Sequence, residues 1–296
     1  MDRRQLEIFL SVVENESISR AAEALHLAQP SVSQAIKQLE REVRGELFLR
    51  STRGVRPTAA GEALIEPARQ VLRDLSVALE SVGHVLGLRG GTLDIVSVPA
   101  LAIDPLASFV GSYRRSFPDV QVRVIDPPDV SDAPAYVRSG RCEIGLVEDM
   151  TPEPELCIHE LAGQEIVLVL PPGAAVGSGP VSWEDLSLFE FVTSPPGRSV
   201  SRSKLEQIFS RTGKQLRVCV ESDHRTAIAD FVMAGAGAAL LRRPISEPLA
   251  AQGARVRPLN PPLLHQVTLV HRRRSLSPAA RAFVGLATKG TGTCTA

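Results

Sequence analysis

The segment SRAAEAL (residues 19–25), HLAQP (26–30) and SVSQAIKQLE (31–40) decides the fold of the N-terminal part of this chain. It predicts two short helices joined by a tight turn, because Ser19 is a good N-cap and the proline of Gln29-Pro30-Ser31 suits a first helical turn. The second helix repeats apolar residues at spacings of four, three and four, and these should face the core: Val32, Ile36, Leu39 and Val43. Residues 2–15 likewise predict an amphipathic first helix.

The outer face of the second short helix carries side chains of the kind that contact DNA. Glutamine can pair with the edge of adenine, serine can donate or accept, and lysine can contact guanine or phosphate. A helix presented in this way fits the major groove. For one helix alone, a solvated surface is the simpler interpretation, but the short turn, the proline and the segment that follows favour DNA. The predicted contacts are Gln29, Pro30, Ser31, Ser33, Gln34 and Lys37.

The next segment, ELFLRSTRGVRPT (46–58), concentrates positive charge beside a glycine. Arg50, Arg53 and Arg56 predict a β-wing that lays arginines against phosphates or into the minor groove, with a solvated loop as the alternative. Residues 1–60 hold nine Lys or Arg and eight Asp or Glu, so this part is barely basic. Binding must therefore depend on where the charges lie and on dimerisation.

Residues 3–62 resemble the LysR-type bacterial transcriptional regulators. The ordered matches are Leu6, Phe9, Ser19, Ala21, Ala22, Leu25, Gln29 to Ser33, Ile36, Leu39, Glu40, Leu47, Phe48, Arg50, Thr58 and Gly61. The chain departs from the family at Pro57, where a branched apolar residue is usual, and in the spacing of Gly45 before Leu47. Both departures are local. The resemblance implies a winged helix-turn-helix domain that binds promoter DNA.

A long helix should follow, capped by Thr58 and running to about residue 88. Its apolar positions alternate spacings of four and three, as in a coiled-coil seam: Leu64, Ala68, Val71, Leu75, Ala78, Val82 and Val85. A helix packed on its own domain is the alternative. We expect a dimer, because a two-fold pair places two recognition helices in successive major grooves about 34 Å apart. The resemblance implies the same linker helix, and tetramers built from two dimers.

Composition excludes several classes of protein. With 33 basic and 33 acidic residues, the chain has no net charge to draw it to nucleic acid as a whole. It starts without a signal peptide, and no apolar run reaches about 18 residues, so a cytoplasmic protein without a membrane span is expected. No catalytic motif such as Gly-x-Ser-x-Gly or His-Glu-x-x-His occurs, so we predict no enzyme and no cofactor.

The four cysteines, Cys142, Cys157, Cys219 and Cys294, lack a Cys-x-x-Cys spacing, so no metal site is predicted. Cys142 precedes an apolar strand and Cys219 lies inside a strand, so both should be buried thiols. The sequence does not exclude a disulfide between Cys142 and Cys157. Residues 289–296 are polar and small, and predict a loose tail.

From residue 92 the pattern changes to alternating strands and helices, which predicts an α/β domain of two similar halves. Asp104-Pro105 should open a helix that runs to about Ser116. The resemblance implies a periplasmic-binding-protein-like effector domain with a cleft between two subdomains, lined by residues 97–101, 193–198 and 221–225. We therefore divide the chain into a DNA-binding domain (1–58), a linker helix (59–89) and an effector-binding domain (90–296). Its subdomains would be 92–161 with 266–289, and 162–265.

Ligands in open α/β sheets bind beyond the carboxyl ends of strands. Two such ends predict the effector site, namely Ser97-Val98-Pro99-Ala100 and Thr193 to Ser199, where Arg198 could clamp a carboxylate. For any single residue an ordinary capped loop is as good an interpretation. Arg242 and Arg243 add to the expectation, since two arginines there favour an acidic effector over simple solvent exposure. The predicted effector-binding residues are Ser97, Val98, Pro99, Ala100, Glu148, Thr193, Ser194, Pro195, Gly197, Arg198, Asp223 and His224.

These features predict a homo-oligomeric regulator that binds promoter DNA and a small-molecule effector, with RNA polymerase as a candidate partner. A regulator of the same fold without an effector is the first alternative. A solute-binding module is a second, because the α/β part alone would allow it. The N-terminal helices argue against that second alternative.

Overall fold

The computed structural model describes residues 1–51, 54–85, 90–175, 177, 179–273 and 276–289. The predictions for Arg53, for the end of the linker helix at 86–89 and for the tail from residue 290 lie outside these residues. The chain forms two compact units, which we describe separately. Unit 1 is built from residues 1–88 and 139–141, and unit 2 from residues 89–138 and 142–296.

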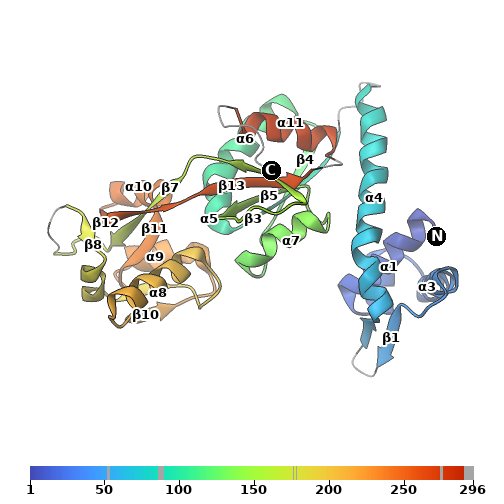
Figure 1. Cartoon of the computed structure of the whole chain (residues 1–296), viewed down its shortest axis with the longest axis horizontal. Helices are drawn as coiled ribbons and strands as arrows, with labels where there is room; N and C mark the ends of the chain where they lie inside the picture. The colour runs from blue at the N-terminus through green and yellow to red at the C-terminus, as the bar shows by residue number, and fades with distance from the viewer. Residues whose placement is uncertain (52–53, 86–89, 176, 178, 274–275, 290–296) are drawn as a thin grey trace. The chain divides into compact units, whose positions relative to one another are not determined.

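Unit 1 begins with three helices, α1 (Arg3–Asn15), α2 (Ile18–Ala24) and α3 (Gln29–Val43) (Figure 1). Asp2 caps α1 by accepting from the Gln5 N–H, while the Gln5 side chain accepts from the Asp2 N–H. The N-cap of α2 is Ser17, whose side chain accepts from the Arg20 N–H. The predicted cap at Ser19 is therefore wrong, because Ser19 already belongs to the helix.

The three helices enclose one hydrophobic core. Phe9, Val12, Ala21, Val32 and Leu39 are fully buried in it. The small side chain of Ala21 suits the close packing of α2 against its neighbours. The inward face predicted for α3 holds for its first three apolar positions. It fails at the fourth, since Val43 in the last helical turn is 41% exposed.

The wing is an antiparallel hairpin of β1 (Phe48–Ser51) and β2 (Gly54–Pro57). Gly54 has a φ of 122°, and a Cβ there would lie 2.9 Å from the carbonyl oxygen of Glu16. The Val55 N–H donates to the same oxygen at 3.1 Å. The hairpin is thus fixed to the end of α1 through backbone groups, which requires glycine at this position.

Helix α4 (Ala59–Val85) completes unit 1. Its predicted cap is confirmed, because the Thr58 hydroxyl accepts from the Gly61 N–H at 3.0 Å. A Cβ on Gly61 would lie 2.2 Å from the carbonyl oxygen of Leu47, so only glycine allows the first turn of α4 this close to the chain before β1.

The predicted seam of α4 divides into two parts. Leu64 and Ala68 pack against the core of unit 1. Beyond them, three seam residues and the neighbouring Leu79 are 41–63% exposed, and we call Val71, Leu75, Leu79 and Val82 the α4 stripe. The α4 stripe continues the heptad pattern on a surface that the core of unit 1 does not cover.

The first lobe of unit 2 is built on a five-stranded sheet with the order β4–β3–β5–β13–β6. Its strands are β3 (Gly91–Ser97), β4 (Val120–Ile125), β5 (Ile144–Glu148), β6 (Leu156–Glu160) and β13 (Val267–Arg272). Strand β3 runs parallel to β4 and β5, while β13 runs antiparallel to β5 and β6.

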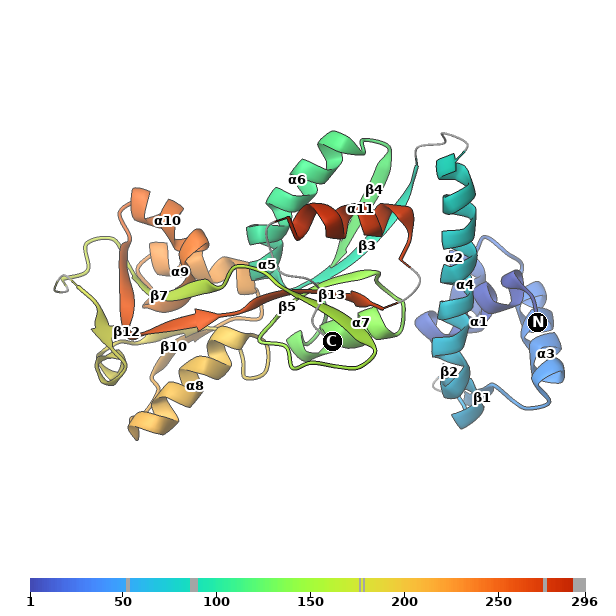
Figure 2. The same ribbon diagram turned by 45° about the horizontal axis from the view of Figure 1, so that its top comes forward.

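Helices cover both faces of this sheet (Figure 2). Tyr113 of α6 (Ala107–Ser116) and Phe283 of α11 (Pro278–Ala287) share one core cluster with Leu93 and Leu269 of the sheet. Val137 of α7 (Ala133–Arg138) belongs to a second cluster on the other face. A 3₁₀ turn (Val130–Asp132) precedes α7.

The predicted helix start at Asp104-Pro105 is confirmed. A short α5 (Pro99–Leu101) and a π-helical turn (Ala102–Leu106) precede α6. Within that turn Asp104 has φ −146° and ψ 126°, which is extended backbone, as expected for the residue before a proline. This kink separates two helices, and the second continues through α6 to Ser116.

The second lobe contains a four-stranded sheet, β11–β7–β12–β8, and a parallel pair, β9 and β10. Its strands are β7 (Gln164–Leu170), β8 (Val181–Ser182), β9 (Phe191–Thr193), β10 (Val218–Glu221), β11 (Ala239–Arg242) and β12 (Arg255–His265). Its helices are α8 (Val200–Thr212), α9 (Ile228–Met233) and α10 (Arg243–Ala251), with 3₁₀ turns at Glu184–Leu188 and Arg225–Ala227. This two-lobed α/β architecture confirms the predicted fold class.

Two crossings connect the lobes, from β6 to β7 and from β12 to β13. The sequence analysis did not predict β12. That strand contains Pro258, Pro261 and Pro262, and its pairing with β7 is interrupted between Pro258 and Leu263. Prolines lack the N–H that a regular ladder needs, so the interruption is what lets them lie within a strand.

The cysteines differ partly from expectation. Cys142 is a fully buried thiol, as predicted. The prediction of a buried thiol is wrong for Cys219, which is exposed. Its strand, β10, pairs only with β9 in a two-stranded sheet. Cys157 is disulfide-bonded, and Cys142 keeps its thiol, so the pair of Cys142 with Cys157 does not form. Cys294 lies outside the described residues.

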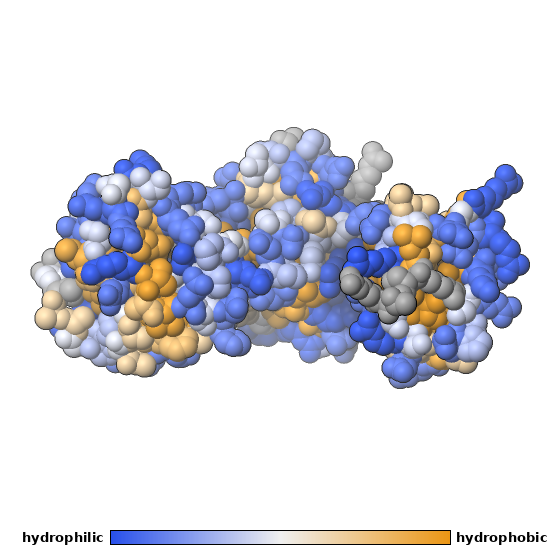
Figure 3. All heavy atoms as spheres, turned by 90° about the horizontal axis from the view of Figure 1, so that it is seen from below, coloured by the Kyte–Doolittle hydropathy of each residue, from blue (hydrophilic) through white to orange (hydrophobic). Residues whose placement is uncertain are grey.

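The face drawn in Figure 3 is mainly hydrophilic, and its hydrophobic residues form separate patches. Within the described part of the chain, every helix is too short or too polar to cross a membrane.

Candidate functional site

The outer face of α3 presents the predicted contact residues of unit 1. Gln29, Pro30, Ser31, Gln34 and Lys37 are exposed, and Ser33 is half-buried. Within the described structure, the side chains of Gln34 and Lys37 have no hydrogen-bond or ion-pair partner in the protein. Their polar groups are therefore available to an external ligand.

The N-terminus of α3 differs from those of α1 and α2. Asp2 and Ser17 cap the first two helices with their side chains, whereas Ala28 at the N-cap of α3 has none to offer. An uncapped helix start with exposed serine and glutamine suits an anion such as a DNA phosphate.

The wing places one predicted arginine clearly on the surface. Arg56 lies on β2 and is exposed. Arg50 lies on β1 opposite Val55, and Arg53 lies outside the described residues. Together with α3, the hairpin gives unit 1 two elements on which basic or polar side chains are presented.

Unit 2 contains a cavity of roughly 860 Å³, a value that includes space open to solvent. Val98, Pro99 and Ala100 contribute from the first lobe, and Thr193 and Val200 from the second. Most of the wall is aliphatic, including Ile103, Val130, Leu205, Ile228 and Ile245. A cavity of this size and composition fits a small metabolite.

Two ion pairs at the cavity join the lobes. Arg242, at the end of β11, is 3% exposed and contacts a carboxylate oxygen of Glu148, at the end of β5. Its Nη1 also donates to Gln164 Oε1 at 2.5 Å. Arg225 donates from Nη2 to both carboxylate oxygens of Asp126, at 2.6 and 2.7 Å. Both arginines come from the second lobe, and both acids from the first.

Glu148 is held ionised by its neighbours. Burial by itself raises the pKa of this carboxyl, but the adjacent His265 and the positive charge of Arg242 outweigh it and bring the pKa below its usual value. His265 is fully buried, with Nδ1 3.4 Å from Glu148 Oε2 and 3.3 Å from Asp149 Oδ2. The charged cluster therefore lies at the crossing from β12 to β13.

The loop after β9 is organised by internal bonds. The hydroxyls of Ser194 and Ser199 lie 2.6 Å apart, and Ser199 caps α8 by accepting from the Arg202 N–H at 3.2 Å. Arg198 points elsewhere, since its Nη1 donates to the Pro128 carbonyl at 2.5 Å. Its Nε lies 3.9 Å from Asp223 Oδ1, so the predicted carboxylate clamp is engaged with the protein itself.

Five of the twelve predicted effector-binding residues line the cavity: Val98, Pro99, Ala100, Glu148 and Thr193. The others lie outside the lining: Ser97, Ser194, Pro195, Gly197, Arg198, Asp223 and His224. Ser97 is 1% exposed and donates to the neighbouring Val98 carbonyl. Arg225, the last residue of the segment 221–225 that was expected at the cleft, also lines the cavity.

The two arginines predicted to favour an acidic effector have internal partners. Arg242 pairs with Glu148, as described, and Arg243 Nη2 lies 2.7 Å from Glu165 Oε2. The side chain of Arg243 is 39% exposed. Both guanidinium groups therefore already form ion pairs within the protein.

Comparison with known protein families gives two matches that together cover most of the chain. Residues 3–62 match the model of the bacterial regulatory helix-turn-helix proteins of the lysR family. Residues 86–291 match the model of the LysR substrate binding domain.

Individual proteins agree with these matches. The probable HTH-type transcriptional regulator LrrA of Synechococcus elongatus is 32% identical over 256 residues, which cover 86% of this chain and 85% of that protein. Full-length OxyR from Pseudomonas aeruginosa, solved as a variant with aspartate in place of a cysteine, has a TM-score of 0.72 at 20% identity and covers 97% of this chain and 93% of its own. Full-length CbnR, solved in complex with its target DNA, has a TM-score of 0.67 at 20% identity, with 98% and 99% covered.

Proposed function

Because the chain belongs to the LysR family and is a DNA-binding transcriptional regulator, we propose that the cavity of unit 2 binds a small-molecule effector that changes transcription of target genes. The observation that carries this proposal is a mainly aliphatic cavity whose walls come from both lobes. An effector there would contact the two lobes at once. We assign the regulator to the bacterial cytoplasm, where its DNA lies, and propose no catalytic reaction for it.

We propose a small anion with an apolar body as the effector. The aliphatic wall would cover the body of such a ligand. Ser201, in the first turn of α8, and Thr193 offer hydroxyls at the cavity, and the positive end of the α8 dipole favours negative charge there. Arg225 adds a partly satisfied guanidinium. Of the other predicted effector residues, we keep those that are not buried as candidates for the entrance of the cavity: Pro195, Gly197, Arg198, Asp223 and His224. Ser97 and Ser194 are buried and would act only through their neighbours.

Effector binding would act on the bonds between lobes. The pairs Arg225–Asp126 and Arg242–Glu148 both bridge the two lobes. A ligand changes the equilibrium between lobe arrangements only by its difference in affinity for them. Competition with these ion pairs is one physical source of that difference.

In unit 1 we propose that α3 reads bases and the wing contacts phosphates. The proposed DNA contacts are Gln29, Pro30, Ser31, Ser33, Gln34, Lys37, Arg50, Arg53 and Arg56. We also propose that the α4 stripe pairs with the same surface of a second chain, which would give a two-fold arrangement of α3 helices. Tetramers and contacts with RNA polymerase are further proposals from the family.

The first experiment measures DNA binding. Purified protein is added to the DNA just upstream of its own gene, in a gel shift with footprinting, and unrelated DNA serves as the control. We expect protection over at least two helical turns. Indifference to all DNA at low salt would contradict the proposed contacts.

The second experiment tests the cavity. A panel of small carboxylates is screened by thermal unfolding of wild-type protein and of Thr193→Val, with Thr212→Val at the far end of α8 as the control. We expect one ligand class to raise Tm in the wild type and the control, and less in Thr193→Val. A panel without effect on Tm would favour a regulator that works without an effector.

The third experiment tests pairing through α4. Leu75→Glu and Leu79→Glu are compared by sedimentation with Leu188→Glu, which changes a 70% exposed leucine in unit 2. We expect the two α4 variants to shift toward monomer and the control to keep the wild-type mass. Unchanged mass in the α4 variants would assign oligomerisation to another surface.

A further inference from the structure

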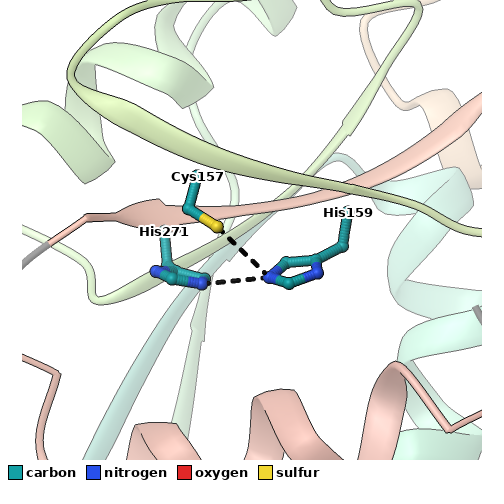
Figure 4. A group of neighbouring side chains, drawn as sticks. All are labelled: Cys157, His159 and His271. Atoms are coloured by element: carbon teal, nitrogen blue, oxygen red, sulfur yellow. Dashed lines mark hydrogen bonds between the residues drawn. The ribbon is translucent and has the colours of Figure 1, made fainter. Parts of the chain in front are cut away.

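Three side chains of metal-binding type converge at the edge of the five-stranded sheet, outside the cavity lining (Figure 4). Cys157 and His159 are two residues apart on β6 and therefore point to the same face. His271 on β13 lies directly opposite Cys157 in the antiparallel register. The strand register thus brings together residues that are distant in the sequence.

The spacing of their ligand atoms matches that of a small tetrahedral ion. His159 Nε2 lies 3.1 Å from His271 Nε2 and 3.5 Å from Cys157 Sγ. For zinc, with bonds of about 2.0–2.1 Å to nitrogen and about 2.3 Å to sulfur, tetrahedral geometry requires roughly 3.3 and 3.6 Å. All three ligand atoms lie within 4.8 Å of one another, and metal binding would bring the remaining pair, Cys157 Sγ and His271 Nε2, to about 3.6 Å.

The protons of this cluster favour a cation. The carbonyl of Arg272 lies 2.7 Å from His271 Nδ1 and can only accept, so Nδ1 carries the proton and Nε2 presents a lone pair. Cys157 is disulfide-bonded, and its sulfur becomes a metal ligand only once that bond is reduced. In the reduced state, a cation at the centre would accept the lone pairs of both Nε2 atoms and of the Cys157 thiolate.

The surroundings of His159 and His271 affect the protonation and the orientation of their rings. Burial lowers the pKa of His159 below its usual value, and the nearby His271 lowers it further. Burial also lowers the pKa of His271, against the effect of its bond to the Arg272 carbonyl. Burial thus favours the neutral over the charged form of both rings, and neutral imidazole is the form that binds metals. The carbonyl bond also fixes the orientation of His271, as outer groups do in known metal sites.

We propose that Cys157, His159 and His271 form a redox-gated site for a zinc-class divalent cation. A dithiol reductant converts the disulfide of Cys157 to two thiols and becomes a cyclic disulfide itself. On metal binding the Cys157 thiol releases its proton to water, and the thiolate joins the two imidazoles as the third ligand. The fourth position is left to water or an external ligand.

The test uses the full-length protein with Co²⁺ as a spectroscopic probe for the zinc position. Oxidised protein is compared with protein reduced by a dithiol and freed of reductant without air, and the thiols are counted before titration. We expect reduced protein to bind one Co²⁺ with a thiolate-to-cobalt absorption that Zn²⁺ abolishes. Oxidised protein should bind at least about tenfold more weakly and lack this absorption, because only a thiolate is a strong ligand.

Variants separate the site from adventitious binding. Cys157→Ser should lose the thiolate absorption, and His271→Gln should weaken Co²⁺ binding at least about tenfold. Cys219→Ser, which removes an exposed thiol elsewhere, should behave like the wild type. Circular dichroism establishes that each variant is folded. Binding that persists in folded His159→Gln/His271→Gln protein, or fully reduced wild type without the absorption, would overturn the proposal.

Discussion

The outer face of α3 and the cavity of unit 2 differ in whether their polar side chains already have partners in the protein. On α3, Gln34 and Lys37 are exposed and have no partner within the described structure. At the cavity, Arg225 and Arg242 are bonded to acids of the opposite lobe. A ligand of α3 replaces only water, whereas a ligand of the cavity meets groups that already hold the protein together.

This difference suits a regulator with two kinds of ligand. A preformed polar face binds DNA without altering internal bonds. A cavity whose charges bridge two lobes makes ligand binding and lobe arrangement depend on each other. We therefore expect the coupling between ligand binding and lobe arrangement to lie in unit 2. Mutations should affect the two regions in different ways.

The largest effect is expected from Glu148→Ala. It would leave Arg242 buried and without its anion, which should cost about 3–5 kcal/mol in the free energy of unfolding. Asp126→Ala, which breaks an ion pair whose acid is 52% exposed, should cost about 1 kcal/mol or less. Urea unfolding followed by the fluorescence of Trp183, the single tryptophan, measures both. Equal losses would remove the contrast between the two pairs.

Gly61→Ala should have the next largest effect, and in unit 1. The added Cβ would meet the Leu47 carbonyl, and such overpacking costs about 1–3 kcal/mol. Gly111→Ala in α6 is the matched control, since its Cβ would find only Arg115 Nη1, at 3.9 Å. There alanine should stabilise the helix by about 1 kcal/mol. Thermal melting with DNA binding as a second readout should show loss in the first variant alone.

Gln34→Ala should change recognition without changing stability. We expect discrimination between specific and unrelated DNA to fall by about 1–3 kcal/mol. Arg56→Ala should instead weaken binding to all DNA and reduce its salt dependence by about one unit of slope. Salt-dependent binding curves on both DNAs distinguish these results. A lowered Tm in Gln34→Ala would show that this side chain is not free of internal roles.

The smallest effect is expected from pH. Because the pKa values of His159 and His271 lie below the usual value of about 6.5, the unfolded chain binds more protons than the folded one just below that pH. Stability should therefore decline as pH falls from about 6.5 to the folded pKa values. The stability of the double variant His159→Gln/His271→Gln should decline less over this pH range. Denaturation series between neutral and mildly acidic pH measure the difference, and identical slopes would contradict it.

Local signals made unit 1 predictable. The proline at position 30, the cap at Thr58 and the periodicity of Val32, Ile36 and Leu39 each act within one or two helical turns. The outward face of α3 follows directly from that periodicity. The errors at Ser19 and Val43 lie at helix ends, where one turn more or less changes little energy.

Long-range pairing made the sites of unit 2 harder to predict. Glu148 was identified, but its partner Arg242 comes from another lobe and was interpreted as a ligand contact. Arg198 was expected at the cavity, yet the carbonyl of Pro128 holds it elsewhere. The group of Cys157, His159 and His271 was not predicted, because His159 and His271 are 112 residues apart and meet only through strand register.

If α4 pairs two chains, the concentration of dimer depends more than linearly on the number of regulator molecules in a cell. Leu75 and Leu79 stand in water in a single chain, so burial of apolar surface favours pairing. Where chains are scarcer than the dimer dissociation constant, the dimer concentration rises with the square of the chain concentration. Doubling expression would then raise occupancy of a weakly filled two-fold operator about fourfold. Promoter output would respond to gene dosage as a threshold and not in proportion.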